Sequence, residues 1–107
     1  MLRVGDLTLD LATHACSRGA RPIPLTTKEF AVLEVLMRAA GRVVSRSHIS
    51  EHAWDDNYDA LSNVIDVYVN YLRKKVDAGR EPKLLHTVRG TGYVLQAEPR
   101  AESREPR

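Results

Sequence analysis

Residues 63–76, NVIDVYVNYLRKKV, carry the side chains whose types and spacing are best suited to binding a ligand. Apolar residues recur there at helical spacing and predict an amphipathic helix with one stripe facing a core: Ile65, Val69, Leu72 and Val76. The opposite side and its margins carry two amides, an aliphatic residue, a phenol and two cations: Asn63, Val67, Asn70, Tyr71, Arg73 and Lys74. Amides can pair with adenine, a small aliphatic side chain can contact the thymine methyl, and a cation can bind guanine or phosphate. This helix therefore either enters the major groove of DNA or has an ordinary solvated outer face.

A second set of residues has the spacing of metal ligands. Residues 48–52, HISEH, match the inverted zinc-protease pattern H-x-x-E-H, with His48 and His52 one helical turn apart. A catalytic zinc site also needs a third protein ligand and a substrate cleft. Because Ile49 should point inward and leave the rest of the motif outside, we interpret the motif as a helix surface that binds zinc only adventitiously. Residues 55–66 resemble a calcium loop weakly, with Ala60 and Asp66 in place of its glycine and glutamate. We expect no catalysis, no functional metal and no cofactor.

The length and composition of the chain predict a single domain. Its 107 residues are 43% hydrophobic, which is enough for one modest core. No apolar run approaches the roughly 18 residues of a membrane span, and the N-terminus lacks the apolar region of a signal peptide. A lone cysteine, Cys16, excludes an internal disulfide and suits a buried position. We expect a soluble intracellular protein that does not associate with a membrane.

Four short strands are predicted ahead of the first helix, at residues 2–4, 7–11, 14–18 and 21–25. Pro22 and Pro24 would place the last of them at the edge of a sheet, since proline cannot donate a ladder hydrogen bond. These strands carry no recognisable chemistry.

Three helices follow. Residues 26–29, TTKE, form a capping box, and Gly41 suits the left-handed cap that would end this first helix. Ser45 can cap a second, shorter helix over residues 46–54, and Ser62 can cap the third. The acidic loop between the last two makes the connection longer than in the simplest helix-turn-helix proteins.

Residues 84–89 and 93–96 are predicted to form a hairpin, since Gly90 and Gly92 lie in the short connection between them. Arg89 at its tip could reach the minor groove or the phosphates of DNA bound to the preceding helix. A helix-turn-helix followed by a hairpin is a winged helix, and Tyr93 is expected to pack at the base of this wing. Residues 97–107 combine two prolines with mixed charge and are predicted to form a disordered tail, which leaves residues 1–96 as the domain.

The net charge of +2 is small, but its distribution is uneven. Residues 1–61 are close to neutral, whereas residues 62–89 contain Arg73, Lys74, Lys75, Arg80, Lys83 and Arg89 against Asp66, Asp77 and Glu81. This excess of positive charge predicts that a polyanion binds to the surface formed by residues 62–89. Within it, Lys75 and Arg80 are interpreted as solvated. Asp66 would be costly beside DNA unless paired, so we expect it to bind a nearby arginine and orient the wing.

Three segments resemble the effector-domain signature of the OmpR/PhoB family of bacterial two-component response regulators: LTTKEFAVLEVLMRAAGRVVSR, SNVIDVYVNYLRKKVD and HTVRGTGYVL. The match covers about residues 2–96 and is specific, because three separated motifs occur in the right order. The resemblance implies an α+β winged helix-turn-helix with an N-terminal antiparallel sheet, three helices and a C-terminal β-hairpin wing. It also implies sequence-specific binding of double-stranded DNA in the bacterial cytoplasm, where the domain regulates transcription as the output of a phosphorylatable receiver. The alternative is a winged helix used for protein–protein contacts only.

The resemblance also assigns roles to residues. Those facing DNA from the recognition helix would be Asn63, Val67, Asn70, Tyr71, Arg73 and Lys74. The wing would contribute Thr87 and Arg89, and the residues near phosphates would be Ser45, Arg46 and Trp54, although Trp54 equally suits half-buried packing. Family members usually bind direct repeats in tandem, about one helical turn apart. Some contact RNA polymerase through the loop that matches residues 55–61: Asp55, Asp56, Asn57, Tyr58 and Asp59.

The chain departs from the family pattern in two ways. It contains no receiver and hence no phosphate-accepting aspartate, so we expect an excised effector domain, with a naturally orphaned effector domain as the alternative. Several family members carry arginines where this chain has Asn70 and Tyr71. Their base preference therefore does not transfer, and fewer phosphate contacts are expected here.

Overall fold

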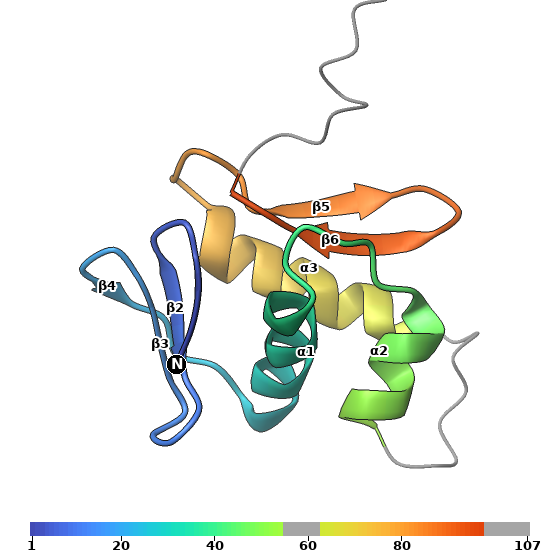
Figure 1. The fold of residues 1–107 in the computed structure, drawn as a ribbon, viewed down its shortest axis with the longest axis horizontal. Coiled ribbons are helices and arrows are strands. Elements are labelled where there is room, and N and C mark those ends of the chain that lie inside the picture. The colour runs from blue at the N-terminus through green and yellow to red at the C-terminus, as the bar shows by residue number, and fades with distance from the viewer. Residues whose placement is uncertain (55–62, 98–107) are drawn as a thin grey trace, which may run out of the picture.

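The structure, a computed structural model, describes residues 1–54 and 63–97. Along the chain, a four-stranded antiparallel sheet is followed by three helices and a two-stranded hairpin, as Figure 1 shows. This is the predicted α+β winged-helix arrangement. The predicted polymerase-contact loop and the predicted tail, except Ala97, lie outside the described residues.

The N-terminal sheet has the strand order β1-β2-β3-β4. Its strands span Leu2–Val4, Leu7–Asp10, Ala15–Arg18 and Arg21–Pro22. Alternation along β2 buries Leu7 and Leu9 completely, while Thr8 on the other face hydrogen-bonds Ser17 of β3 at 2.9 Å. β4 lies at the sheet edge as predicted and is shorter than predicted, because Pro22 and Pro24 cannot extend the ladder.

Helix α1 spans Thr27–Arg38 and begins with the predicted capping box. The Thr26 hydroxyl accepts a hydrogen bond from the Glu29 N–H, and the Glu29 carboxylate accepts one from the Thr26 N–H. The predicted left-handed conformation of Gly41 is confirmed, but the helix ends before the predicted position. α1 stops at Arg38 with Ala39 as its C-cap, and Gly41 adopts a left-handed φ of 86° within the turn that follows.

Helix α2 spans Arg46–Ala53, and the Ser45 hydroxyl caps it by accepting from the His48 N–H at 3.0 Å. Helix α3 spans Val64–Asp77 and has Asn63 at its N-cap position. It therefore begins one residue later than predicted, and the Ser62 cap lies outside the described residues. The hairpin strands β5 and β6 span Leu85–Val88 and Gly92–Leu95.

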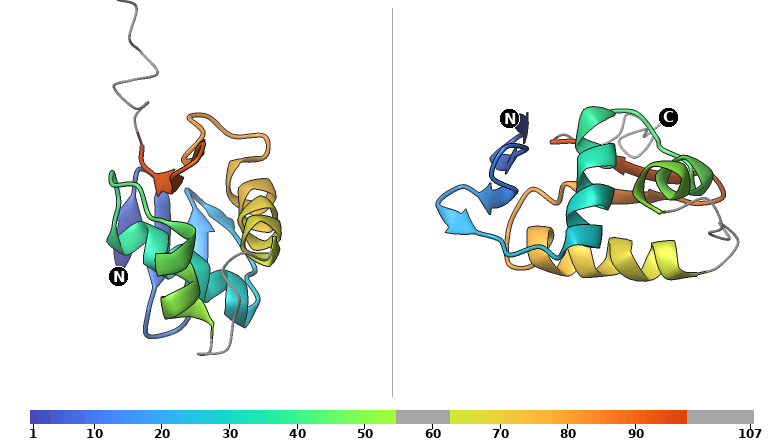
Figure 2. Two further views of the ribbon diagram at one scale, coloured as in Figure 1. Left: turned by 90° about the vertical axis from the view of Figure 1, so that its right-hand side faces the viewer. Right: turned by 90° about the horizontal axis from the view of Figure 1, so that it is seen from below.

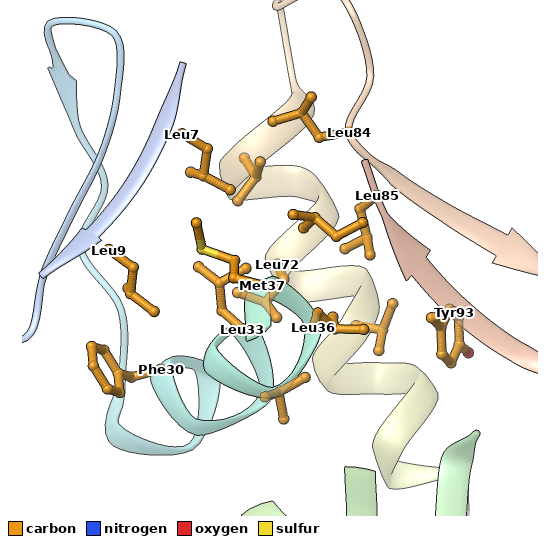
Figure 3. Close-up of a cluster of buried hydrophobic side chains, with 14 of the residues drawn as sticks. Leu7, Leu9, Phe30, Leu33, Leu36, Met37, Leu72, Leu84, Leu85 and Tyr93 are labelled. Carbon is orange, nitrogen blue, oxygen red and sulfur yellow. The ribbon is translucent and has the colours of Figure 1, made fainter. Parts of the chain in front are cut away.

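A single core joins the sheet, α1, α3 and the base of the wing, as the side chains in Figure 3 show. From α3, the four predicted core residues are all fully buried: Ile65, Val69, Leu72 and Val76. Leu33 and Leu36 of α1 meet them from one side, and Leu84 closes the core beside the wing. At roughly 1.5–3 kcal/mol for each large buried aliphatic side chain, this stripe fixes which face of α3 remains outside.

The base of the wing is attached to the segment before α2. Tyr93 and Val44 exchange two backbone hydrogen bonds of 2.7 and 2.9 Å, which makes the chain ahead of α2 a third strand of the hairpin at one position. Gly92 permits this approach, since a Cβ there would lie 2.0 Å from the Val44 carbonyl oxygen. The hairpin of β5 and β6 consequently lies alongside α3, with the turn between its strands on the side of α2 (Figures 1 and 2).

A buried arginine fixes the far end of α3. Arg18 of β3 is fully buried, and its guanidinium donates to Asp77 at 3.1 Å, to the Val76 carbonyl at 2.9 Å, to Asp6 at 2.9 Å and to the Pro82 carbonyl. The Asp77 carboxylate, itself buried, accepts the N–H groups of Leu84 and Leu85 at 3.0 Å each. This cluster holds the sheet, the C-terminal end of α3 and the start of the wing in one arrangement.

Candidate nucleic-acid interface

The outer face of α3 is open to solvent, as its sequence predicted. Asn63, Asn70, Tyr71 and Lys74 are exposed, and Tyr71 retains 46% of its accessible surface. Val67 between them is half-buried rather than fully exposed. Asn63 occupies the N-cap position but makes no capping hydrogen bond with its side chain, so its amide remains outside the helix. The face that could enter a groove is therefore present and uncovered within the described residues.

Arg73 connects this face to the wing. Its guanidinium donates to the Asn70 side-chain oxygen at 2.9 Å and to the Thr87 hydroxyl of β5 at 2.7 Å. Three predicted DNA-binding residues from two separate elements thus form one hydrogen-bonded group. All of its members lie at the surface, so holding them in register requires no buried charge.

A hollow separates the wing tip from the start of α2. Predicted residues from both elements line it: Ser45, Arg46, Thr87 and Arg89. The first N–H groups of a helix have no partner within the helix, so this end of α2 attracts anions. Ser47 and Thr91 also line the hollow, and sequence reasoning missed them. The sequence offered one signal for each of them. Ser47 lies in the first turn of α2, and Thr91 lies beside Gly90 at the wing tip.

The floor of the hollow contains an acidic side chain that is paired as predicted. Asp66 of α3 lies 3.2 Å from Arg46 of α2 and accepts a hydrogen bond from the Tyr93 hydroxyl of β6. Burial and the adjacent Asp66 carboxylate raise the pKa of Tyr93 to about 12, so this phenol keeps its proton. One carboxylate therefore ties α2, α3 and the wing base together, and it reduces the local positive charge of Arg46.

Trp54 lies at the other end of α2 and is half-buried. Its ring meets Tyr68 of α3 edge-on, with centroids 5.5 Å apart, and Tyr68 meets Tyr71 in the same way at 5.7 Å. The Lys28 ammonium lies 5.0 Å above the indole and donates to the Ala53 carbonyl at the end of α2. The packing role considered for Trp54 is confirmed, and its contact with phosphate stays a prediction.

The interpretation of Lys75 as a solvated cation was wrong. Its ammonium donates to the Glu29 carboxylate at 2.6 Å and to the Pro24 carbonyl at 2.9 Å. Burial opposes ionisation of Glu29, but the hydrogen bonds from Lys75 and the Thr26 N–H outweigh it and lower the pKa of Glu29. Arg80 is half-buried. The positively charged surface is consequently smaller than the count of charged residues suggested.

Comparison with known proteins agrees with this geometry. Residues 20–95 match the protein family described as "Transcriptional regulatory protein, C terminal". The response regulator MprA of Mycobacterium tuberculosis is 49% identical over 98 residues, which cover 92% of this chain and 43% of MprA. MprA of Mycobacterium sp. strain KMS is 49% identical over 94 residues, covering 88% of this chain and 41% of the relative. The chain spans less than half the length of these curated relatives.

Solved structures show the same fold. The DNA-binding domain of Klebsiella pneumoniae RstA, solved in complex with the RstA box, superposes with a TM-score of 0.79 at 30% identity, covering 91% of this chain and 97% of that one. The DNA-binding domain of Escherichia coli CpxR gives a TM-score of 0.78, also at 30% identity and with the same coverage. The chain belongs to the OmpR/PhoB-type family of transcriptional regulatory C-terminal domains, the winged-helix DNA-binding domains of response regulators. This membership favours DNA binding over the alternative of protein contacts alone. Within the described residues, no helix is long and apolar enough to cross a membrane.

Proposed function

We propose that the chain regulates transcription as the output domain of a bacterial response regulator, by binding double-stranded DNA in a sequence-specific manner. The observation that carries this proposal is the group formed by Arg73, Asn70 and Thr87, which makes the open face of α3 continuous with the wing. The major groove, about 12 Å wide, admits a helix, and a wing beside that helix then meets the adjacent backbone and minor groove.

Base contacts would come from Asn63, Val67, Asn70 and Tyr71, all on the open side of α3. Asn70 is the most constrained of them. Because its side-chain oxygen already accepts from Arg73, the amide nitrogen is left to face outward as a donor. We therefore propose that Asn70 donates to a base acceptor in the major groove, such as guanine O6 or N7, adenine N7 or thymine O4.

Phosphate contacts would set the position of the domain on the duplex. Arg73 and Lys74 lie along the margin of α3, and the hollow at the start of α2 offers Ser45 and Arg46 together with the N-terminal end of that helix. Trp54 would meet phosphate at the opposite end of α2. Because Asp66 partly neutralises Arg46, the helix terminus contributes more than that side chain to anion binding in the hollow.

The wing would complete the contact. Thr87 and Arg89 are exposed on one edge of the hairpin, and Arg89 lies in the turn between β5 and β6. A guanidinium at this position can enter the minor groove or pair with a phosphate.

The proposals about larger assemblies are based on the resemblance to the family. We propose that two copies bind direct repeats in tandem, that residues 55–61 contact RNA polymerase, and that a receiver in the whole protein controls binding in the bacterial cytoplasm. Residues 1–96 would be the complete winged-helix unit, with residues 97–107 as a tail. No catalytic step is proposed.

In vitro selection from random duplexes tests the central proposal. The purified chain should enrich a defined sequence, and in a gel shift the enriched duplex should bind more tightly than a scrambled duplex of equal length and composition. Typical specific sites bind roughly 10³–10⁷ times more tightly than non-specific DNA. Failure to enrich any sequence, with a correctly folded domain, would leave the protein-contact function as the better account.

A further inference from the structure

The outer side of α2 carries a cluster of metal-ligating side chains that DNA binding does not use. His48, Glu51 and His52 are all exposed, and their ligand atoms lie within 4.8 Å of one another. They occupy positions i, i+3 and i+4 of one helix, which places them side by side on its surface. Helix formation by itself therefore assembles the cluster, and no movement of the backbone is needed.

The distances suit a transition-metal ion. Zinc bonds of about 2.0–2.2 Å in tetrahedral geometry hold the ligand atoms roughly 3.4 Å apart. Rotation of three exposed side chains can close the remaining gap from 4.8 Å. The set of two imidazoles and one carboxylate matches that of zinc sites with three protein ligands, in which water fills the fourth position.

The hydrogen bonding of His52 supports this role independently. Its Nδ1 lies 3.0 Å from the His48 carbonyl oxygen, where it serves as a donor to that carbonyl. The remaining lone pair is then on Nε2, which is left to bind a metal ion. Metal-bound histidines commonly donate the other ring N–H to a backbone carbonyl, which fixes the tautomer that the metal requires.

The surroundings leave the cluster accessible. A hollow between α1 and α2 is lined by both histidines together with Glu34 and Arg38 of α1. Arg38 would repel a cation, but it pairs with Glu34 at 2.9 Å, so the two charges offset each other. Arg42 lies beside His48 in the neighbouring hollow.

We propose that His48, Glu51 and His52 form a surface site for a divalent transition-metal ion, with zinc as the ion of first choice. The site lies on the outer face of the helix whose first turn lines the hollow beside the wing. A bound ion would link successive turns of α2 and add positive charge to this side of the domain. The inference is independent of the proposed DNA function.

Calorimetric titration of the intact chain with zinc chloride at about pH 7.5 tests the site. We expect one equivalent of zinc to bind. His48→Gln and His52→Gln should each weaken binding by more than the roughly tenfold that loss of an outer hydrogen-bond partner causes. Glu51→Gln should weaken it in the same direction.

A histidine outside the cluster supplies the matched control. His14 has a positive φ of 62°, and asparagine tolerates that conformation, so His14→Asn removes an imidazole without straining the backbone. This control should bind zinc as the wild type does, and zinc should raise the melting temperature of both proteins but not of His52→Gln. Equal zinc affinity of wild type and His48→Gln, or an equal loss in His14→Asn, would overturn the proposal.

Discussion

Arg18 and Arg73 each connect α3 to a β-strand, and the surroundings of the two side chains differ completely. Arg18 is fully buried at the C-terminal end of the helix and donates to two carboxylates and two carbonyls. Arg73 lies at the surface on the outer side and donates to the neutral side chains of Asn70 and Thr87. The charge of Arg18 is balanced by carboxylates of the fold, whereas the partners of Arg73 orient its charge without neutralising it.

This difference distinguishes a charge that stabilises the fold, at Arg18, from a charge that is available for function, at Arg73. Both side chains contact or belong to α3. A buried ion that is bonded to carboxylates and carbonyls of the fold contributes to holding the elements in place and is not available to a ligand. A surface ion that is held by neutral partners keeps its net charge for a phosphate or a base. The same contrast recurs between neighbours: Lys75 is paired with Glu29, and Lys74 beside it is exposed.

Replacement of Asp77 should have the largest effect on stability. Asp77→Ala leaves the Arg18 guanidinium buried with less compensation and removes the acceptor for the Leu84 and Leu85 N–H groups. Loss of one partner from a buried pair costs about 3–5 kcal/mol, and we expect that decrease in the free energy of unfolding by urea denaturation. Arg73→Met is the control at the surface arginine, which is only half-buried, and should change the free energy of unfolding by less than about 1 kcal/mol. Similar losses in the two variants would show that burial does not distinguish these arginines.

The two adjacent lysines make a closer comparison. Lys75→Met removes a charged hydrogen bond to the buried Glu29 and should lower the free energy of unfolding by about 1.5–3 kcal/mol at neutral pH. Lys74→Met should leave stability nearly unchanged and weaken DNA binding. Equal destabilisation by the two changes would contradict the assigned roles.

The pH dependence of the Lys75 variant follows from the pKa of Glu29. This pKa is lowered in the folded protein, so ionisation of Glu29 adds stability above its ordinary pKa of 4.5, and that stability is lost as the pH falls through the lower folded value. Lys75→Met removes a donor that lowers the pKa. The stability difference between wild type and variant should therefore shrink as the pH falls from neutral past 4.5 and through the lower folded pKa of Glu29, as measured by denaturation at each pH. A difference that stays constant over this range would mean that Lys75 acts through packing alone.

The features that could be predicted from the sequence depend on local patterns. The capping box at Thr26 and Glu29 and the apolar stripe of α3 depend only on residues a few positions apart, and both are confirmed. The open face of α3 follows from that stripe, since burial of one side leaves the other outside. The pairing of Asp66 with an arginine was also foreseeable, because an unpaired carboxylate is unfavourable beside a polyanion.

The features that could not be predicted depend on contacts between residues that are far apart in the sequence. Lys75 and Glu29 are 46 positions apart, and Arg18 and Asp77 are 59 apart, so no local spacing reveals either pair. A charge count treats all four as surface residues. The early end of α1 has a similar cause, because the Gly41 N–H bonds to the Leu95 carbonyl of the wing and not to the helix.

Within the open region, Asn70→Ala should reduce binding to the selected duplex by about 1–3 kcal/mol and relax preference at one or two base pairs. The reason is that alanine removes the outward amide donor and also the acceptor that orients Arg73. Folding stability should stay within about 0.5 kcal/mol of wild type, because the residue is exposed. Repeating the selection with the variant measures the change. An unchanged preference, or an equal loss on scrambled DNA, would remove Asn70 from the base-reading group.

Arg89→Ala should have the smallest effect on sequence preference and a clear effect on salt dependence. If the wing-tip guanidinium neutralises one phosphate, its loss lowers the slope of log affinity against log salt concentration by about 0.9 and weakens binding to all duplexes similarly. Arg3→Ala is the control, since it removes the same charge from an exposed position in β1, at the opposite end of the molecule from the wing tip (Figure 1). Equal slopes for Arg89→Ala and wild type would reject the groove role of the wing tip. An equal decrease in Arg3→Ala would mean that net charge, and not the position of the wing, determines the electrostatic part of binding.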